Sequence, residues 1–354
     1  MVAVGDLSKD SILDIAVANF GTNSIGIFMG FRNGSFDNHT DHSIRISRPI
    51  VISISDLNND ALLGIVGINC RTHSISIPHG YENGKFSSAA TYWTGYDSFP
   101  SSVVIADFNN DNYLDLAVTN YGTDNIVSYS TDSASQYTIG VEDFNQDNRL
   151  DLLATNKGTY NIAVLIGDGN GTFANPKMYS TGATSPISLA VGDINKDSRL
   201  NVIVVSNDTG ALNIPFGSFE GLENQVNYSA DSSPYAVTIG DLNNDGTLGI
   251  IIANDNSNDI LTSSNPYVVA IGDLNNDTRL DIVVANYHSD ALSVLLGHGN
   301  GSFADENRYD TGFMPASIAN GDFNNDTRLD TAVANCSGDD VSVLLGYGNG
   351  SFAN

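Results

Sequence analysis

Eight short acidic segments recur along the chain, and each carries oxygen-bearing side chains at alternate positions. Their shared pattern, D-x-[NS]-x-D-x-x-x-[D/N/G], returns at intervals of roughly fifty residues in most cases. Carboxylates and amides at alternate positions of a curled loop supply the oxygen ligands that calcium prefers. The pattern therefore predicts calcium binding. The opening aspartates are Asp6, Asp56, Asp107, Asp143, Asp193, Asp241, Asp273 and Asp322.

Five of the segments carry a complete set of expected ligands. These are the side chains at positions one, three, five and nine, together with the main-chain carbonyl at position seven. The first set contains the weaker hydroxyl of Ser8. In chain order, the sets are Asp6, Ser8, Asp10, Ile12 and Asp14; Asp107, Asn109, Asp111, Tyr113 and Asp115; Asp143, Asn145, Asp147, Arg149 and Asp151; Asp273, Asn275, Asp277, Arg279 and Asp281; and Asp322, Asn324, Asp326, Arg328 and Asp330.

Three segments lack the carboxylate at position nine. Gly64 replaces it in the second repeat, Asn201 in the fifth and Gly249 in the sixth. We expect these three sites to be weak or empty. In the fifth repeat the candidate ligands that remain are Asp193, Asn195 and Asp197.

The alternative to metal binding is that these Asp and Asn residues only cap turns, as they do in many β-proteins. Eight copies in register, each between apolar runs, favour calcium over simple capping. Position six usually requires glycine for a left-handed turn, and only Gly246 meets that requirement. The bidentate glutamate of an EF-hand is absent, so we expect a strand-loop-strand site.

The apolar runs on either side of each acidic segment have the composition of β-strands. In the seventh repeat, residues 267–272 and 280–286 flank the loop, 291–297 form a third run, and a polar fourth run lies near 307–309. The inner runs are almost continuously apolar, so both of their faces must be covered by neighbouring sheets. This arrangement is typical of a β-propeller.

We therefore predict an all-β propeller of about eight blades, with seven as the alternative, and up to four antiparallel strands per blade. Two blades are expected to be truncated, because the third run is largely missing between Tyr129 and Tyr137 and between Leu261 and Pro266. A repeat array is one structural unit, so residues 1–354 form a single domain. The expected repeats are approximately 1–48, 49–99, 100–136, 137–184, 185–233, 234–265, 266–314 and 315–354.

The seventh repeat also carries the residues by which the chain resembles a known family. The sequences VAIGDLNND, LDIVVAN and LLGHGNGSF at positions 269–277, 280–286 and 295–303 resemble FG-GAP or VCBS repeats. Such repeats form the N-terminal β-propeller of integrin α subunits. The resemblance implies a calcium-binding extracellular recognition module that mediates protein–protein interaction or cell adhesion.

Composition narrows the range of functions. The formal net charge is −27, which leaves no basic face for a nucleic-acid partner. No apolar run reaches the roughly 20 residues of a membrane span, so we expect no membrane insertion in this segment. No serine lies in a G-x-S-x-G elbow and no histidines recur at metal-ligand spacing, so we predict that the chain is not an enzyme.

Two alternatives to an adhesion module remain open. The chain could be a lectin-like propeller that binds a glycan, or the non-catalytic propeller part of a larger secreted enzyme. In each case the protein or glycan ligand is expected on the loop face opposite the calcium loops. We expect an extracellular or cell-surface location. No signal peptide is visible and both ends fall within a repeat, so we expect a fragment of a longer protein.

Overall fold

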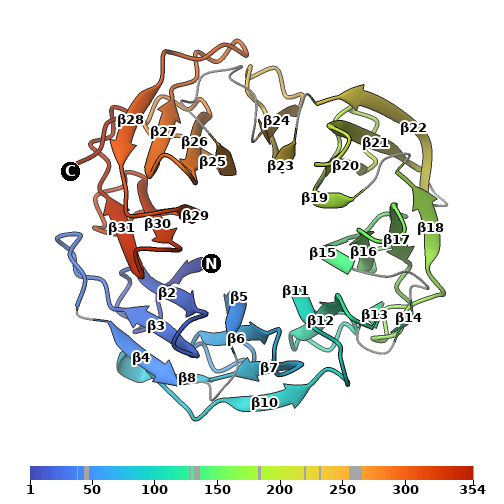
Figure 1. The fold of residues 1–354 in the computed structure, drawn as a ribbon, viewed down its shortest axis with the longest axis horizontal. Helices are drawn as coiled ribbons and strands as arrows, with labels where there is room; N and C mark the ends of the chain where they lie inside the picture. Colours follow the sequence, from blue (N-terminus) through green and yellow to red (C-terminus); the bar gives the residue numbers. More distant parts are fainter. Residues whose placement is uncertain are drawn as a thin grey trace.

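The structure is a computed structural model, and it describes residues 1–353 except 38, 44–47, 124, 127–128, 131–135, 182–184, 219–220, 231–232 and 255–264. Its strands form antiparallel sheets that are arranged radially around a ring (Figure 1). The one helical element among the described residues is the 3-10 turn η1 (Glu82–Gly84). The chain is therefore all-β, as predicted, and no helix in this part of it is long and apolar enough to cross a membrane.

Each repeat contributes one sheet, and successive repeats occupy successive places around the ring. The sheets consist of β1 (Val2–Gly5), β2 (Asp14–Asn19), β3 (Ser24–Phe28) and β4 (Thr40–Ser43); β5 (Pro49–Ser55), β6 (Gly64–Asn69), β7 (Ser74–Ile77) and β10 (Ala90–Trp93); β11 (Pro100–Ala106), β12 (Asp115–Asn120), β13 (Asn125–Ile126) and β14 (Tyr129–Ser130); β15 (Gln136–Glu142), β16 (Asp151–Asn156), β17 (Asn161–Leu165) and β18 (Lys177–Ser180); β19 (Pro186–Gly192), β20 (Asn201–Ser206), β21 (Ala211–Ser218) and β22 (Gly221–Ser229); β23 (Pro234–Gly240) and β24 (Gly249–Asn254); β25 (Pro266–Gly272), β26 (Asp281–Asn286), β27 (Ala291–Leu295) and β28 (Asn307–Asp310); and β29 (Pro315–Gly321), β30 (Asp330–Asn335) and β31 (Asp340–Leu344). A small ribbon of β8 (Gly80–Tyr81) and β9 (Lys85–Phe86) extends the second sheet's hairpin.

The number of blades differs from the prediction of about eight, two of them truncated. Within the described residues, six sheets have four strands, the last sheet has three, and that of the sixth repeat has two. Counted as complete four-stranded blades, the propeller has six, so the expected eight, or alternatively seven, is wrong. The third repeat was expected to be truncated, yet β13 and β14 complete its sheet with only two residues each. The sixth repeat has β23 and β24 alone, and residues 255–264, where its third strand was expected to be missing, lie outside the described residues.

The second strands are buried on both faces, as their continuous apolar sequences predicted. Every residue of β20 and β26 is buried. The core is divided among clusters that join neighbouring sheets: Leu153 of β16 packs with Val202 and Val204 of β20. Burial of apolar surface between sheets is worth roughly 25 cal/mol per Å². Lateral stacking of the sheets therefore supplies most of the stabilisation.

The ring closes by packing the first sheet against the last. Val2 and Ile15 of the first sheet share a buried cluster with Phe323 and Ala332 of the eighth repeat. The Val2 main-chain N–H also donates a hydrogen bond to Ser317 Oγ at 3.2 Å. β1 pairs with β2 within its own sheet, so the terminal strands close the ring face to face and do not share one blade.

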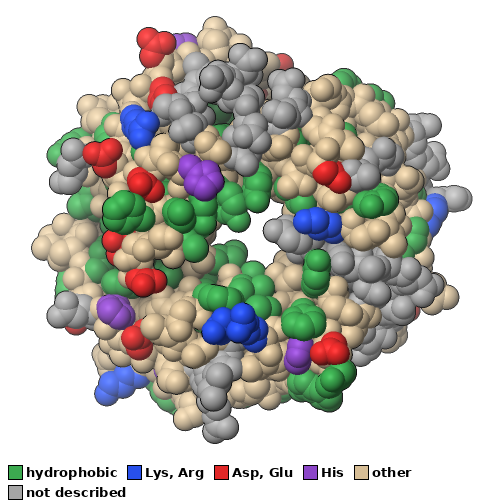
Figure 2. Space-filling model, in the orientation of Figure 1, with side chains coloured by type: hydrophobic (Ala, Val, Ile, Leu, Met, Phe, Trp, Pro, Cys, Tyr) green, Lys and Arg blue, Asp and Glu red, His purple; other side chains and the backbone are tan. Residues whose placement is uncertain are grey.

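Neighbouring strands of each sheet are antiparallel, so successive connections between them alternate between the two faces of the disc. The loops between first and second strands, which carry the acidic segments, lie on one face of the disc together with the third-to-fourth hairpins. We call this the acidic face. The remaining connections lie on the opposite face. In the view of Figure 2, hydrophobic side chains line part of the rim of a central opening, and acidic side chains are scattered over the face around it.

Candidate calcium loops and an aromatic patch

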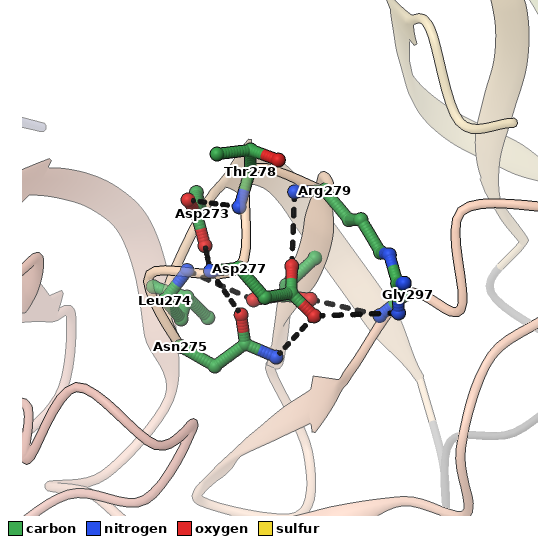
Figure 3. Close-up of polar contacts among 8 residues, drawn as sticks. Asp273, Leu274, Asn275, Asp277, Thr278, Arg279 and Gly297 are labelled. Atoms are coloured by element: carbon green, nitrogen blue, oxygen red, sulfur yellow. Dashed lines mark hydrogen bonds and ion pairs between the residues drawn. The ribbon is translucent and has the colours of Figure 1, made fainter. Parts of the chain in front are cut away.

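The acidic loop of the seventh repeat is curled by hydrogen bonds from its own main chain (Figure 3). Asp273 accepts the N–H of Asp277 with Oδ1 at 3.0 Å and the N–H of Thr278 with Oδ2 at 2.8 Å. Asp277 in turn accepts the N–H of Arg279 with Oδ1 at 2.9 Å. Asn275 Oδ1 also accepts the Asp277 N–H, at 3.1 Å. These short-range bonds gather the side chains of positions one, three and five around one bend of the loop.

The same curl occurs in every repeat. In all eight loops the opening aspartate accepts the N–H groups of positions five and six. Positions four and six are left-handed throughout, with φ between 55° and 77°. Position six thus has the backbone conformation that glycine favours, although Gly246 alone is glycine. Thr278 and Thr327, both at φ 68°, are β-branched residues held in this costly conformation.

Position nine, predicted to be a metal ligand, is buried and bonded to the main chain. Asp281 is fully buried, and its carboxylate accepts the N–H of Leu274 and the N–H of Gly297, each at 2.8 Å. The aspartate therefore ties the acidic loop to the end of the third strand. Asp14, Asp151 and Asp330 make the same pair of bonds.

Burial perturbs the acidity of these position-nine carboxyls. Desolvation raises the pKa of Asp14 and of Asp151 to about 6, although main-chain N–H donors oppose the shift. Desolvation likewise raises the pKa of Asp281, and repulsion from Asp277 and Asp273 adds to the rise. The acidic groups of one loop are therefore close enough to repel one another, and a bound cation would relieve that repulsion.

The acidic loops offer oxygen donors of the type that calcium prefers. Among the described residues, no group of three or more His, Cys, Asp or Glu side chains is arranged to hold a metal ion. The oxygens of positions one, three and five converge on one loop, and each carboxylate keeps lone pairs beyond those used in hydrogen bonds. Position nine lies on the buried side, bonded to the main chain. The residues thus fit a hard cation in donor type through positions one, three and five.

Position seven contributes a side chain that the sequence analysis did not consider. Only its carbonyl was expected to act, yet Arg279 places Nη1 3.6 Å from Asp277 Oδ2. Arg328 lies at the same distance from Asp326. A guanidinium therefore partly neutralises the position-five carboxylate in these two loops. The presence of arginine at position seven is the sequence signal that could have indicated it.

Position four links one loop to the next around the acidic face, which the sequence analysis also missed. Asn59 Nδ2 donates to the carbonyl of Asn112 at 3.3 Å, and Lys196 Nζ donates to the carbonyl of Asp245 at 2.7 Å. Gln146 bonds the carbonyl of Ser198 in the same way. Asn325 Nδ2 donates to the carbonyl of Ser11 at 3.4 Å, so the contact is repeated where the ring closes.

The opposite face carries a cluster of exposed aromatic residues beside the connection between β10 and β11. Trp93 is 68% exposed, Tyr96 77%, Phe99 40% and Tyr121 46%. The Tyr121 N–H donates to the Phe99 carbonyl at 3.0 Å, which joins the connection to the end of β12. We call these four residues the aromatic patch. Trp93 is the one tryptophan of the chain, and the sequence analysis did not single out this residue.

Comparison with protein families identifies the class of the protein. A model of the FG-GAP-like repeat matches residues 56–118, 143–204 and 273–333, which together make up more than half of the chain. The chain therefore belongs to the FG-GAP-like repeat family, as its resemblance implied. Comparison with curated protein sequences finds no match.

Solved structures share the propeller architecture. BBS1N, crystallised in complex with ARL6DN, is 13% identical with a TM-score of 0.55, and the match covers 97% of this chain and 90% of BBS1N. A functionally unknown protein from Desulfotomaculum acetoxidans is 11% identical with a TM-score of 0.52, covering 96% and 94%. Virginiamycin B lyase from Staphylococcus aureus is 13% identical with a TM-score of 0.52, covering 96% and 97%. At these low sequence identities the structural similarity shows the fold alone. One of the three similar proteins, virginiamycin B lyase, is an enzyme, so the shared fold does not decide the function.

Proposed function

We propose that the chain is a calcium-binding propeller without catalytic activity that binds another protein through the face opposite its acidic loops. FG-GAP repeats suggest a protein-interaction propeller, and BBS1N, a structural neighbour, was crystallised with a protein partner. The proposal goes beyond these observations in three respects: calcium binding, a role in adhesion, and the face that contacts the partner.

The acidic loops carry the calcium part of the proposal. Eight copies keep the same curl, with left-handed residues at positions four and six even where these are not glycine. Left-handed backbone costs roughly 1–2 kcal/mol per ordinary residue. A turn whose only task is to reverse the chain has cheaper solutions, so the repeated cost favours a ligand-binding role.

The affinity of these loops is expected to be modest. Extracellular calcium modules have dissociation constants of roughly 10⁻⁴–10⁻³ M, and fewer carboxylates and non-glycine residues at position six place these loops near that end. The loops of the second, fifth and sixth repeats are expected to be the weakest, because each lacks the position-nine aspartate that ties the acidic loop to the end of the third strand. Such sites would fill outside a cell, which supports an extracellular or cell-surface location. Surface biotinylation of cells that produce the protein tests this, and labelling confined to lysed cells opposes it.

The aromatic patch carries the partner part of the proposal. Tryptophan and tyrosine are enriched among the residues that dominate binding energy, and such residues cluster near the centre of an interface. Trp93 and Tyr96 are the two most exposed large hydrophobic residues among those described. They stand on a rigid scaffold of stacked sheets, so binding would cost little ordering.

The partner proposal is tested by comparing the protein with its Trp93→Ala/Tyr96→Ala variant on two surfaces. One surface presents a panel of extracellular-matrix proteins and the other an array of glycans, both with calcium present. We expect at least one matrix protein to bind and the variant to lose that binding. Strong binding to several glycans with no protein binding would support the lectin alternative and overturn the proposal.

A further inference from the structure

The outer strand of the second sheet has an uncharged edge. β10 lies at the outer rim of the ring (Figure 1) and pairs with β7, and within the described residues no strand pairs with its other side. Residues 86–96, which include β10, contain no charged side chain. The other described outer strands of four residues each expose a charged one: Asp41 in β4, Lys177 in β18 and Arg308 in β28. Charges on an edge strand oppose its pairing with another chain, so β10 alone among these four strands lacks that protection.

The main chain of β10 directs hydrogen-bonding groups away from its own sheet. The Thr94 N–H donates to the His73 carbonyl at 2.8 Å, in register with the pairing of β10 and β7. Successive residues of an antiparallel strand alternate between bonding one neighbour and facing the other side. Tyr92 therefore bonds β7, whereas Thr91 and Trp93 point their N–H and C=O groups outward. These groups can pair with a further strand.

Exposed aromatic side chains accompany this open main chain. The third residue of β28, Tyr309, packs on Phe352 with ring centroids 5.2 Å apart. The third residue of β10, Tyr92, is instead 53% exposed, and Trp93 beside it is 68% exposed. Burying a whole aromatic side chain removes about 150–250 Å² from water, so a strand that covered Tyr92 and Trp93 would remove roughly 250 Å². The edge of β10 thus combines open hydrogen-bonding groups with apolar surface.

We propose that β10 pairs antiparallel with β10 of a second copy of this chain, so that two sheets become one across a two-fold axis. Such a contact uses the same edge on both copies and therefore closes at a dimer. The uncharged edge suits this occupant, because two copies that each carry a net charge of −27 repel one another wherever charged surfaces meet. The dimer does not depend on the function proposed above.

The charges that flank β10 complement a second copy. Lys85 precedes the strand and Asp97 follows it, and both side chains are exposed. Antiparallel pairing brings the Lys85 end of each copy to the Asp97 end of the other. Glu82 is also exposed before the strand and offsets part of this attraction, so the main chain and the aromatic side chains must supply most of the affinity.

The dimer is expected to be weak. Tyr92 and Trp93 of both copies together contribute roughly 500 Å² of aromatic surface. Interfaces below about 1,200 Å² are typical of transient complexes, so we expect a dissociation constant above about 1 μM. Trp93 also belongs to the aromatic patch, and it stays open to a partner at the low concentrations where the dimer dissociates.

Sedimentation velocity from about 1 to about 200 μM protein in 0.15 M NaCl tests the dimer. We expect the mass to rise from 37.5 kDa towards twice that value. The emission of Trp93, the one tryptophan, should shift to shorter wavelength over the same concentrations. Tyr92→Lys should raise the dissociation constant about tenfold or more, because it charges the edge. Tyr228→Lys is the matched control on β22, since Tyr228 is also 53% exposed, and it should leave dimerisation unchanged.

Two further measurements separate strand pairing from contact through side chains alone. Thr91→Pro removes an outward N–H without removing a bond to β7, so it should weaken the dimer about tenfold while circular dichroism shows the fold retained. Labelling with [¹⁵N]tryptophan marks one main-chain amide, that of Trp93, whose hydrogen exchange should slow as the dimer forms.

Four results would overturn the proposal. A monomer at every concentration would leave the edge to another partner or to none. A dimer that Tyr92→Lys does not weaken would place the contact elsewhere. Assembly that continues beyond two copies would exclude a closed two-fold contact. Exchange of the Trp93 amide at the same rate in monomer and dimer would exclude pairing through the main chain of β10.

Discussion

Phe323 of the eighth repeat packs edge-on against Phe36 of the first, with ring centroids 5.9 Å apart and an interplanar angle of 68°. Phe108 and Phe173, from the consecutive third and fourth repeats, make the same contact at 5.5 Å and 71°. The interface that closes the ring therefore repeats an internal interface between neighbouring sheets. The propeller is closed by the same side-chain packing that stacks its blades.

Replacing Phe323 with alanine should lower the free energy of unfolding by about 3–5 kcal/mol, because a fully buried aromatic ring is removed from this interface. Phe313→Ala is the control. Its side chain is 64% exposed, so it should change stability by no more than about 0.5 kcal/mol. Urea unfolding followed by circular dichroism measures both. Equal effects of the two substitutions would contradict a closed ring.

Thr278→Gly should raise the free energy of unfolding by about 1 kcal/mol, because glycine tolerates the left-handed backbone that threonine adopts there at φ 68°. The reverse change at the same position of the sixth loop, Gly246→Thr, should destabilise by about 1–2 kcal/mol. Thermal unfolding of the two variants tests the pair. Opposite signs are expected, and a destabilising Thr278→Gly would argue that the threonine side chain makes an essential contact.

Arg279→Gln should increase the calcium affinity of the seventh loop by up to about fivefold, because it removes a positive charge beside Asp277. Arg308→Gln is the matched control, since that guanidinium donates to the Ser289 carbonyl and lies outside the acidic loops. Calorimetric titration with CaCl₂ measures the calcium affinity of both variants. A decreased affinity in Arg279→Gln would show that the arginine supports the loop more than it competes with the ion.

Stability should fall as the pH rises from about 4 to about 6. Asp14 and Asp151 have a pKa raised by burial to about 6, against 3.8 as the ordinary value. Across this window the folded state holds more protons than the unfolded state, so raising the pH favours unfolding until these groups are ionised in both states. Unfolding free energies measured from pH 4 to pH 7 without calcium test this.

The Asp14→Asn/Asp151→Asn variant isolates the two carboxyls from the remaining acidic groups. It is expected to be less stable than the parent, since an amide cannot accept both main-chain N–H bonds, and its stability should depend less steeply on pH. Asn201 illustrates this cost in the natural sequence. It accepts the N–H of Ile194 at 2.9 Å but leaves its own Nδ2 buried without a partner. An unaltered slope would assign the pH dependence to other groups.

The sequence predicted the features that depend on local pattern. Continuous apolar runs such as β26 predicted strands covered on both faces, and the acidic loops curl through bonds between residues at most five apart. Each of these features depends on residues within one repeat. Because the repeat recurs along the chain, the features could be predicted from the sequence.

Other features depend on contacts between distant residues and were missed. The position-nine aspartate was predicted to bind the metal, and its bond to the N–H of Gly297 was not foreseen, because Gly297 follows the third strand and lies 16 residues from Asp281. The bond from Asn325 to Ser11 joins opposite ends of the chain. The number of blades was overestimated because blades were counted from the acidic loops, which recur whether or not a sheet has four strands.

Thermal unfolding of chelator-treated protein during addition of calcium tests the central claim most directly. Ligand that binds only the folded state raises its stability by mass action, so the melting temperature should climb steadily up to about 10 mM CaCl₂. NaCl of equal ionic strength supplies the comparison. A larger rise with calcium than with sodium is predicted. The same melting temperature in both salts would contradict calcium binding by the acidic loops.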